Sequence, residues 1–259
     1  MRMTTAGTTI DLNADLGESF GPWRMGRDAE MLDIVTSANV ACGFHAGDPV
    51  EMRRTVALCR EKGVAVGAHP GFRDAEGFGR RRILGLSDEE LTTLMLYQIG
   101  ALQAIARAEG AEVTHVKPHG ALNNMATEDR AMAELLVAAT RAAGPDLTVV
   151  AMPATAFEHA AQADGGPYVA EVFADRAYAD DGTLVPRGTP GAMIHDADIA
   201  ADNVLRMIDE QAVVSLNGKR IPVRPQTVCV HGDSAGAVAM AGHIRARLER
   251  AGVTVARFA

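Results

Sequence analysis

Four histidines stand at or just beyond the ends of short apolar stretches, each followed within two residues by a glycine or a proline. They are His45 in GFHAG, His69 in AHPG, His119 in KPHG and His231 in VHGD. One histidine alone is more often structural than catalytic, but four in equivalent positions indicate a shared site. Imidazoles bind divalent metal ions and also relay protons near neutral pH. The pattern therefore predicts either an acid–base site or a metal centre, whose candidate ligands are Asp11, His45, His69 and His119.

Carboxylate, amide and cationic side chains occur in the same kind of position. A carboxylate such as Asp15 could act as a general base, while Lys117 or Arg176 could stabilise negative charge. Lys117 lies between a valine and a proline, which favours a side chain directed into a site. Glu171 is instead expected to form a buried ion pair within its strand. The further candidates are Asp11, Asn13, Asp15, Glu18, Lys117, Asp175, Arg176 and Asp233.

Seven short segments, apolar nearly throughout, are predicted to be strands that are buried on both faces. Amphipathic segments separate most of them, and alternating strands and helices predict a parallel sheet. The polar candidates follow six of the seven segments. Parallel α/β folds bind ligands at the carboxyl ends of their strands, so these residues are expected to converge. The predicted strands are Thr8–Leu12, Ala38–Ala41, Val64–Gly67, Thr114–Val116, Leu147–Ala151, Tyr168–Val172 and Thr227–Val230.

Capping signals mark two helices clearly. Asp48 and Pro49 supply an N-cap and a proline at the first helical position, and Gly63 ends that helix. A capping box at 87–90 opens a longer helix that ends at Gly110. Further helical patterns follow Thr127, Pro153, Asp198 and Ser234.

The fold class that these elements predict is α/β, either an open doubly wound sheet or a (β/α) barrel. The first strand is not followed by G-x-G-x-x-G, which argues against a dinucleotide-binding sheet. No linker-like stretch divides the chain, so we expect a single domain over 1–259. Asn217 and Gly218 lie between alternating residues and predict a small hairpin inserted before the last strand.

Composition excludes several classes of protein. The chain has 259 residues and a formal net charge of −8, with basic residues dispersed, so no nucleic-acid surface is predicted. No apolar run is long enough for a membrane span, and the N-terminus lacks the apolar centre of a signal peptide. Three scattered cysteines indicate a reduced cytoplasm. No P-loop motif is present. A small-molecule substrate is expected, and a homo-oligomer is compatible with the sequence.

At these same residues the sequence resembles the LamB/YcsF family, over nearly the whole chain from Ile10 to the final helix. The resemblance implies an incomplete (β/α) barrel, akin to glycoside hydrolases and metal-dependent deacetylases, which agrees with the seven predicted strands. Its matching stretches are IDLNADLGESFGPW, SANVACGFHAGDP, GAHPGFRDAEGFGRR, YQIGAL, HVKPHGALNN, EVFADRAYADDGTLVPR, PGA and VCVHGD.

The resemblance implies ATP-dependent hydrolytic opening of 5-oxoproline (pyroglutamate) to L-glutamate, in a complex with B and C subunits. ATP is then a co-substrate of the complex. The chain departs from the family at Ala14, where members often carry Cys, and at Asn123, where they often carry Tyr. The residues implied to be catalytic are Asp15, His45, His69, Lys117 and His119. Those implied to bind substrate are Asn13, Glu18, Asp175, Arg176, His231 and Asp233.

Two other functions stay open at this point. One is a stand-alone metal-dependent deacetylase or amidohydrolase of the same barrel superfamily, which the Asp and His set would suit. The other is a non-catalytic subunit that only binds a partner, although such a role would not require so many ionisable groups at one edge of the sheet.

Overall fold

The computed structural model describes residues 7–232 and 235–258. Within these residues, seven parallel strands close into a barrel, because the last of them pairs with both the sixth and the first. The other strands follow one another around the barrel in chain order. The predicted single-domain (β/α) barrel is therefore the observed fold. Its strands are β1 (Thr9–Leu16), β2 (Ser37–Ala41), β3 (Ala65–His69), β4 (Val113–Val116), β5 (Thr148–Ala151), β6 (Tyr168–Phe173) and β9 (Thr227–Cys229).

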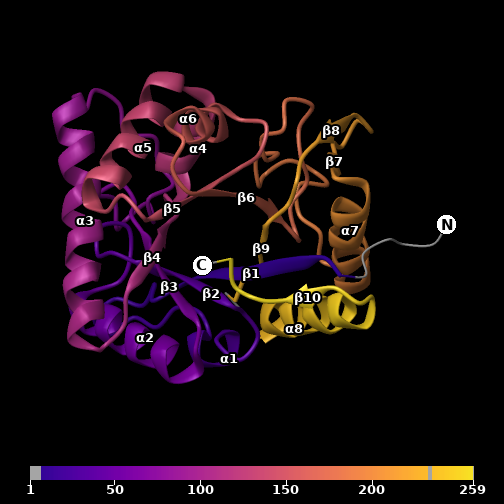
Figure 1. The fold of residues 1–259 in the computed structure, drawn as a ribbon, viewed down its shortest axis with the longest axis horizontal. Coiled ribbons are helices and arrows are strands. Elements are labelled where there is room, and N and C mark those ends of the chain that lie inside the picture. Colours follow the sequence, from indigo (N-terminus) through magenta and orange to yellow (C-terminus); the bar gives the residue numbers. More distant parts are fainter. Residues whose placement is uncertain (1–6, 233–234, 259) are drawn as a thin grey trace.

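The helices lie around the outside of the barrel (Figure 1). Across residues 7–232 and 235–258, no helix is both long and apolar enough to span a bilayer. The helices are α1 (Asp28–Met31), α2 (Pro49–Lys62), α3 (Asp88–Ala108), α4 (Gly120–Glu128), α5 (Arg130–Ala143), α6 (Ala156–Asp164), α7 (Ala197–Glu210) and α8 (Ala235–Arg250).

The predicted helix starts are confirmed where a cap marks them. The Asp48 side chain accepts hydrogen bonds from the N–H groups of Val50 and Glu51, and Gly63 ends α2 in the left-handed region at φ 69°. Ser87 and Glu90 form the expected reciprocal capping box of α3. These caps need only contacts between near neighbours in the chain, so they are readable from sequence.

The predicted hairpin is also present. Strands β7 (Ala212–Val214) and β8 (Arg220–Pro222) pair antiparallel, with the Asn217–Gly218 turn between them. It sits beside α7, on the long stretch of chain that separates β6 from β9 (Figure 1). A further short strand, β10 (Thr254–Val255), pairs with the start of β1 and takes no part in closing the barrel.

Alternate residues of each strand face opposite sides of the barrel wall. In β1, the even-numbered residues of Ile10–Leu16 belong to the main apolar core between strands and helices. The odd-numbered residues Asp11, Asn13 and Asp15 face the interior, where they make hydrogen bonds to residues of other strands. The barrel interior is therefore largely polar, and most of the apolar core lies outside it.

Several elements differ from the prediction: α1 and β10 were not expected, and the differences at β1 and α4 bear on the site. Strand β1 was expected to end at Leu12 but continues to Leu16, so Asn13 and Asp15 lie on the strand rather than in a loop. The strand continues through Asn13 and Asp15 because the barrel interior offers polar partners to these side chains. Helix α4 was not predicted, and the helix expected after Thr127 is α5, which begins at Arg130. Helix α8 begins at Ala235, while Ser234 lies outside the described residues.

Candidate active site and metal centre

Lys117 is the central cation of the barrel interior. It directly follows β4, and its backbone N–H donates to the carbonyl of Ala68 on β3. Its Nζ atom donates to Oδ1 of Asp15 at 3.0 Å and to Oδ1 of Asn13 at 3.2 Å. The same atom lies 2.7 Å from Oε1 of Glu171. Residues from several different strands thus supply one buried ammonium and its partners.

Burial and charge together set the protonation of this group. Burial alone would lower the pKa of Lys117, but the carboxylate of Asp15 and its neighbours outweigh it and raise the pKa well above its usual value. Burial raises the pKa of Asp15, yet His69 and Lys117 reverse this and hold it well below its ordinary value. Burial raises the pKa of Glu171, and Lys117 only partly offsets it. Asp15 and Lys117 therefore form a persistent ion pair.

Asp11 lies further down the barrel than the predicted metal centre requires. Its carboxylate accepts hydrogen bonds from the hydroxyls of Thr36, Ser37 and Thr227. Asp11 precedes Asp15 by four residues of a continuous strand, a separation of about 13 Å at the usual rise per residue. The structure therefore does not bring Asp11 to the histidines, and this candidate ligand is withdrawn.

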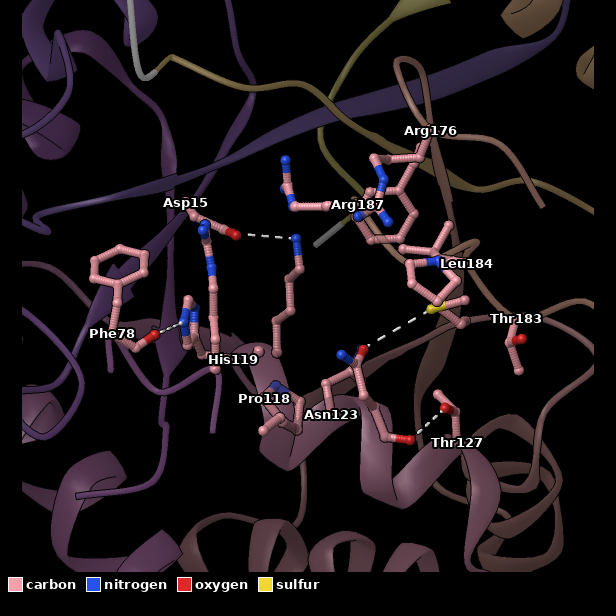
Figure 2. A pocket seen from close by; sticks show the side chains of 18 of the residues that line it. Asp15, Phe78, Pro118, His119, Asn123, Thr127, Arg176, Thr183, Leu184 and Arg187 are labelled. Atoms are coloured by element: carbon pink, nitrogen blue, oxygen red, sulfur yellow. Dashed lines mark hydrogen bonds and ion pairs between the residues drawn. The ribbon is translucent and has the colours of Figure 1, made fainter. Parts of the chain in front are cut away.

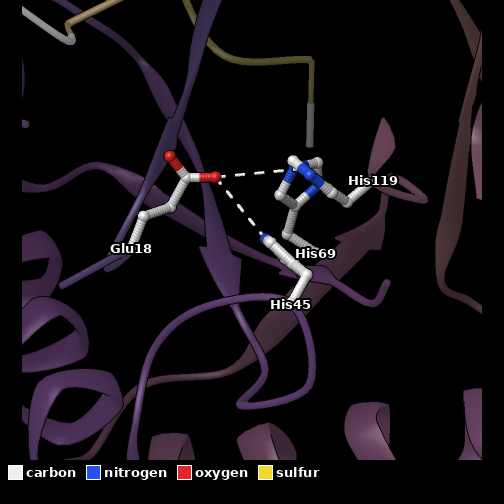
Figure 3. A group of neighbouring side chains, drawn as sticks. All are labelled: Glu18, His45, His69 and His119. Atoms are coloured by element: carbon white, nitrogen blue, oxygen red, sulfur yellow. Dashed lines mark hydrogen bonds and ion pairs between the residues drawn. The ribbon is translucent and has the colours of Figure 1, made fainter. Parts of the chain in front are cut away.

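The carboxylate that does join the histidines is Glu18, just after β1 (Figure 3). One ligand atom from each of Glu18, His45, His69 and His119 lies within 4.8 Å of all the others. Nδ1 of His119 is 3.0 Å from Nε2 of His69, and Nε2 of His45 is 3.5 Å from Oε1 of Glu18. The rings of His45 and His119 stack with their centroids 3.7 Å apart.

Backbone carbonyls orient two of these rings. Nδ1 of His69 lies 2.6 Å from the carbonyl oxygen of Lys117, and Nε2 of His119 lies 2.8 Å from that of Phe78. A carbonyl only accepts, so each of these nitrogens carries the hydrogen. Burial and the neighbouring His69 lower the pKa of His119 to about 3, which keeps its ring neutral. The lone pair on Nδ1 of His119 then faces Nε2 of His69, an arrangement that a bound cation would satisfy.

His45 shows the same need for a partner. Neither of its ring nitrogens makes a hydrogen bond within the described part of the chain, although the side chain is buried. Burial first, and then the neighbouring histidines, hold its pKa well below the ordinary value. Among the described residues, Nε2 has only its 3.5 Å contact with Glu18. A buried nitrogen without a hydrogen bond is costly, and coordination would remove that cost. Three imidazoles with one carboxylate form a ligand set that suits zinc or a similar divalent ion.

A second polar group lies beyond β6 and β9. Nδ1 of His231 is 2.7 Å from Oδ2 of Asp175, and its Nε2 is 3.3 Å from Nη2 of Arg187. Nη2 of Arg176 donates to the carbonyl of Val185 at 2.7 Å. This outer group therefore connects the strand ends to the loop after β6.

One cavity joins the two groups. Its volume is about 490 Å³, and it opens at the carboxyl ends of the strands (Figure 2). Its wall combines acidic and histidine side chains with cations from the opposite side and with Asn123 of α4. The ionisable residues on this wall are Asp15, Glu18, His69, Lys117, His119, Arg80, Arg82, Glu128, Arg176, Arg187 and His231.

The model of the LamB/YcsF family matches residues 10–259. The chain belongs to the LamB/YcsF family. It is 55% identical over 252 residues to the A subunit of the 5-oxoprolinase of Rhodopseudomonas palustris (strain BisA53), covering 97% of this chain and 99% of that protein. The crystal structure of a lactam utilization protein from Thermus thermophilus superposes with a TM-score of 0.91 at 46% identity, covering 97% of this chain and 100% of that one.

A more distant likeness concerns the fold alone. A family 4 carbohydrate esterase from Streptomyces lividans, solved in complex with acetate, superposes with a TM-score of 0.51 at 13% identity. The alignment covers 98% of this chain and 94% of that one. The LamB/YcsF barrel therefore shares its architecture with deacetylase-like barrels, as the family resemblance implied.

The structure of this LamB/YcsF chain brings most of the sequence-predicted residues to one cavity. Asn13 lies beneath Lys117, while Asp175 reaches the site through His231. Asp233, a predicted substrate-binding residue, lies outside the described residues. The residues grouped at or directly beside the cavity are Asp15, Glu18, His45, His69, Lys117, His119, Arg176 and His231.

Sequence reasoning gave no role to Arg187 or Glu128 on the cavity wall, and it underestimated Glu171. Glu171 was expected to form only a structural ion pair; it forms that pair, but with Lys117 at the centre of the site. Arg187 was given no role, although the matching stretch EVFADRAYADDGTLVPR ends on it, because it lies in an irregular loop where no periodicity points to it. Of the two departures from the family, Ala14 faces the apolar core between β1 and the helices, whereas Asn123 lines the cavity.

Proposed function

We propose that this chain is the A subunit of a 5-oxoprolinase, which opens 5-oxoproline hydrolytically to L-glutamate together with B and C subunits and with hydrolysis of ATP. The observation that carries the proposal is the position of Asp15, which bridges two different groups. Its Oδ1 accepts from Lys117 at 3.0 Å, and its Oδ2 lies 3.3 Å from Nε2 of His69. The names of the relatives at 55% and 46% identity support the same substrate class.

Hydrolysis of the lactam requires a base, a stabiliser of negative charge and a proton donor. A water molecule at the cavity wall gives its proton to the carboxylate of Asp15 or Glu18, and its oxygen bonds to the amide carbon. The ammonium of Lys117 stabilises the negative charge that develops on the carbonyl oxygen. The ring C–N bond then breaks, and the ring nitrogen takes the proton through the histidines to become the amine of glutamate.

The residues that would hold a divalent cation are Glu18, His45, His69 and His119, whose donor atoms lie within 4.8 Å of one another at the cavity wall or directly behind it. When bound, such a cation supplies Lewis-acid polarisation of the amide carbonyl. The hydrogen bonds of His69 and His119 to backbone carbonyls fix which nitrogen of each ring faces the cavity. These rings therefore need no rearrangement before they act.

The need for ATP follows from the chemistry of the substrate. A five-membered lactam is stabilised by amide resonance, and its closure is favoured by entropy, so opening needs coupling to another reaction. Transfer of the γ-phosphoryl group of ATP to the amide oxygen supplies this coupling, because it makes the amide carbon more electrophilic. Addition of the first water and cleavage of the C–N bond then leave an acyl phosphate, which a second water hydrolyses to glutamate and phosphate. The proposal assigns ATP mainly to the B and C subunits or to a site without a P-loop, because this chain has no such motif. It also places the reaction in the cytoplasm, where ATP is available and the three cysteines stay reduced.

One assay tests this function. Purified chain is incubated with 5-oxoproline, with and without ATP and with and without B and C subunits, and glutamate is measured. Release of glutamate that requires all components supports the proposal. Lys117→Ala and His45→Ala should abolish release, whereas His243→Gln, a change at a surface histidine paired with Asp198, should not. Near-normal glutamate release by folded Lys117→Ala would overturn the assignment.

The histidine cluster favours one second candidate, a metal-dependent amidohydrolase or deacetylase that acts alone. The same purified chain distinguishes it, because that enzyme would hydrolyse an amide with bound metal and without ATP or partners. A subunit that only binds its partners would leave Lys117→Ala as active in the complex as the unchanged chain. That outcome would favour the non-catalytic role.

A further inference from the structure

We propose that Arg176 and Arg187 form an oxyanion subsite that binds the carboxylate of the cyclic amide substrate. In this arrangement His231 and Asp175 position Arg187 instead of touching the substrate. The inference rests on the proposed function for the identity of the substrate, and it assigns Arg187 a role that neither the sequence nor the family resemblance indicated.

Arg176 is a buried cation with unused hydrogen-bonding capacity. Its side chain is part of the cavity wall, yet only 8% of the residue is exposed. One donor, Nη2, is satisfied by the carbonyl of Val185, but the buried Nε has no acceptor in the described part of the chain. A buried donor without an acceptor costs free energy, which a ligand oxygen would recover. Arg176 therefore calls for an acceptor from the cavity.

Arg187 approaches the same space from the loop after β6. Figure 2 shows its side chain extending across the cavity toward the side on which Asp15 lies. The carboxylate of Asp175 accepts from Nδ1 of His231 at 2.7 Å, because a carboxylate can only accept. Nε2 of His231 then has a lone pair for Nη2 of Arg187, which lies 3.3 Å away. This chain of contacts orients the guanidinium without neutralising it.

The two arginines create a surplus of positive charge on this wall. Burial, and then the charge of Arg187, lower the pKa of Arg176, and Asp175 offsets this only in part. Oδ2 of Asp175 is already bonded to His231, while its buried Oδ1 makes no hydrogen bond within the described residues. Lys117 on the facing wall is paired with Asp15 and Glu171. An anion from the cavity is the missing partner. Guanidinium groups match a planar carboxylate better than a single ammonium does, which favours a carboxylate ligand.

The shape of the substrate fits this assignment. In 5-oxoproline the ring nitrogen lies between two carbons: one is the amide carbonyl carbon, and the other bears the carboxylate. A carboxylate held at Arg176 and Arg187 would direct the amide toward Asp15 and Lys117, which line the same cavity. The subsite would therefore select lactams that carry a carboxylate over neutral lactams of the same size.

The test compares 5-oxoproline with its neutral analogue 5-oxoprolinamide in the complex with B and C subunits. For Arg187→Gln we expect KM for 5-oxoproline to rise about 10- to 100-fold, the range for a lost hydrogen bond to a charged group, with a much smaller change in kcat. The preference for 5-oxoproline over the amide should collapse. Arg187→Lys should recover part of this preference, because lysine keeps the positive charge but cannot form the paired hydrogen bonds of a guanidinium. Arg107→Gln, at an exposed arginine of α3 outside the cavity wall, is the matched control.

A separate measurement tests whether His231 and Asp175 position Arg187. His231→Gln and Asp175→Asn should raise KM less than Arg187→Gln does, and combining either with Arg187→Gln should add little, because all act through one guanidinium. Additive effects would contradict the positioning role. If Arg187→Gln raised KM for ATP alone, the subsite would belong to a phosphoryl group and the carboxylate assignment would fall.

Direct binding separates this inference from the proposed function. Calorimetry on the isolated full chain measures the affinities for 5-oxoproline and 5-oxoprolinamide without any turnover. Tighter binding of 5-oxoproline that Arg187→Gln removes would support the subsite even if the complex released no glutamate, in which case the proposed function alone would fail. Equal loss of both affinities in Arg187→Gln would overturn the subsite.

Discussion

Nζ of Lys117 lies 2.7 Å from Oε1 of Glu171 inside the barrel, and both side chains are almost completely shielded from water. Asp15 contacts the same ammonium from the cavity side. Two carboxyl groups thus share one buried cation, so the stability of the barrel and the charge state of the site depend on the same side chain.

Replacing Lys117 should therefore destabilise the fold. Lys117→Met leaves the Asp15 and Glu171 carboxyl groups buried without a cation, which we expect to cost about 3–5 kcal/mol in the free energy of unfolding. The double variant Lys117→Met/Glu171→Gln should recover part of this loss, because one uncompensated acid is removed. Urea denaturation measures both. A Lys117→Met protein as stable as the unchanged chain would contradict the central role of this ion pair.

The histidine cluster should bind about one divalent ion per chain, as a compact set of this ligand type does. After treatment with a chelator, titration with Zn²⁺ should raise the melting temperature, because the ion binds the folded state only. His69→Gln and His119→Gln should weaken binding strongly, whereas His243→Gln should not. Elemental analysis and calorimetry provide the measurements. If metal binding were unaffected by both cluster variants, the histidines would be a proton relay and not ligands.

Gly71 should be essential for the position of His45. A Cβ atom at Gly71 would lie 2.6 Å from Nδ1 of His45, which is too close for any real contact. Gly71→Ala should therefore displace the imidazole, lower the melting temperature and weaken metal binding. Gly100→Ala is the matched control, since no atom lies within 4 Å of the added Cβ. Within helix α3 that change should stabilise the protein by about 0.5–1 kcal/mol.

Asp28 should make stability fall as the pH rises. Burial raises its pKa from 3.8 to about 6, while the N–H of Gly17, 2.8 Å away, lowers it less. Between these two values the unfolded chain loses the proton and the folded chain keeps it, so ionisation favours unfolding. Asp28→Asn should remove up to about 1.4 kcal/mol per pH unit of this slope. The difference between the two proteins in urea unfolding at pH 4 to 7 isolates the effect; parallel curves would refute it.

Local signals predicted the parts of the fold that depend on neighbouring residues. The caps at Asp48 and Ser87 are such contacts. Alternating strands and helices predicted a parallel sheet, but the choice of a barrel over an open sheet came from the family resemblance. The end of β1 was predicted too early, because Asn13 and Asp15 suggest a loop unless the polar nature of the barrel interior is known. That property arises from side chains of several strands together, which no single segment reveals.

The candidate site also divides into residues that a general rule could group and residues that depend on the tertiary structure. The rule that parallel strands present ligands at their carboxyl ends was enough to group His69, Lys117 and His119. It named Asp11 as the candidate carboxylate ligand and Glu18 as a substrate contact, because the position of each depends on how far β1 continues before it turns. Arg187 required the tertiary path of an irregular loop, which brings it to His231 although 44 residues separate them in the chain.

The alternation along β1 has a practical consequence for anyone who wishes to engineer this protein. Even-numbered residues from Ile10 to Leu16 pack in the apolar core against the helices, while their odd-numbered neighbours face the barrel interior. Thermal robustness can therefore be tuned by repacking one set of positions without altering the chemistry of the other. A shift of one residue in the pairing of β1 with its neighbours would be strongly destabilising. Every carboxylate of the strand would then face the apolar core, and every aliphatic side chain would face the cavity.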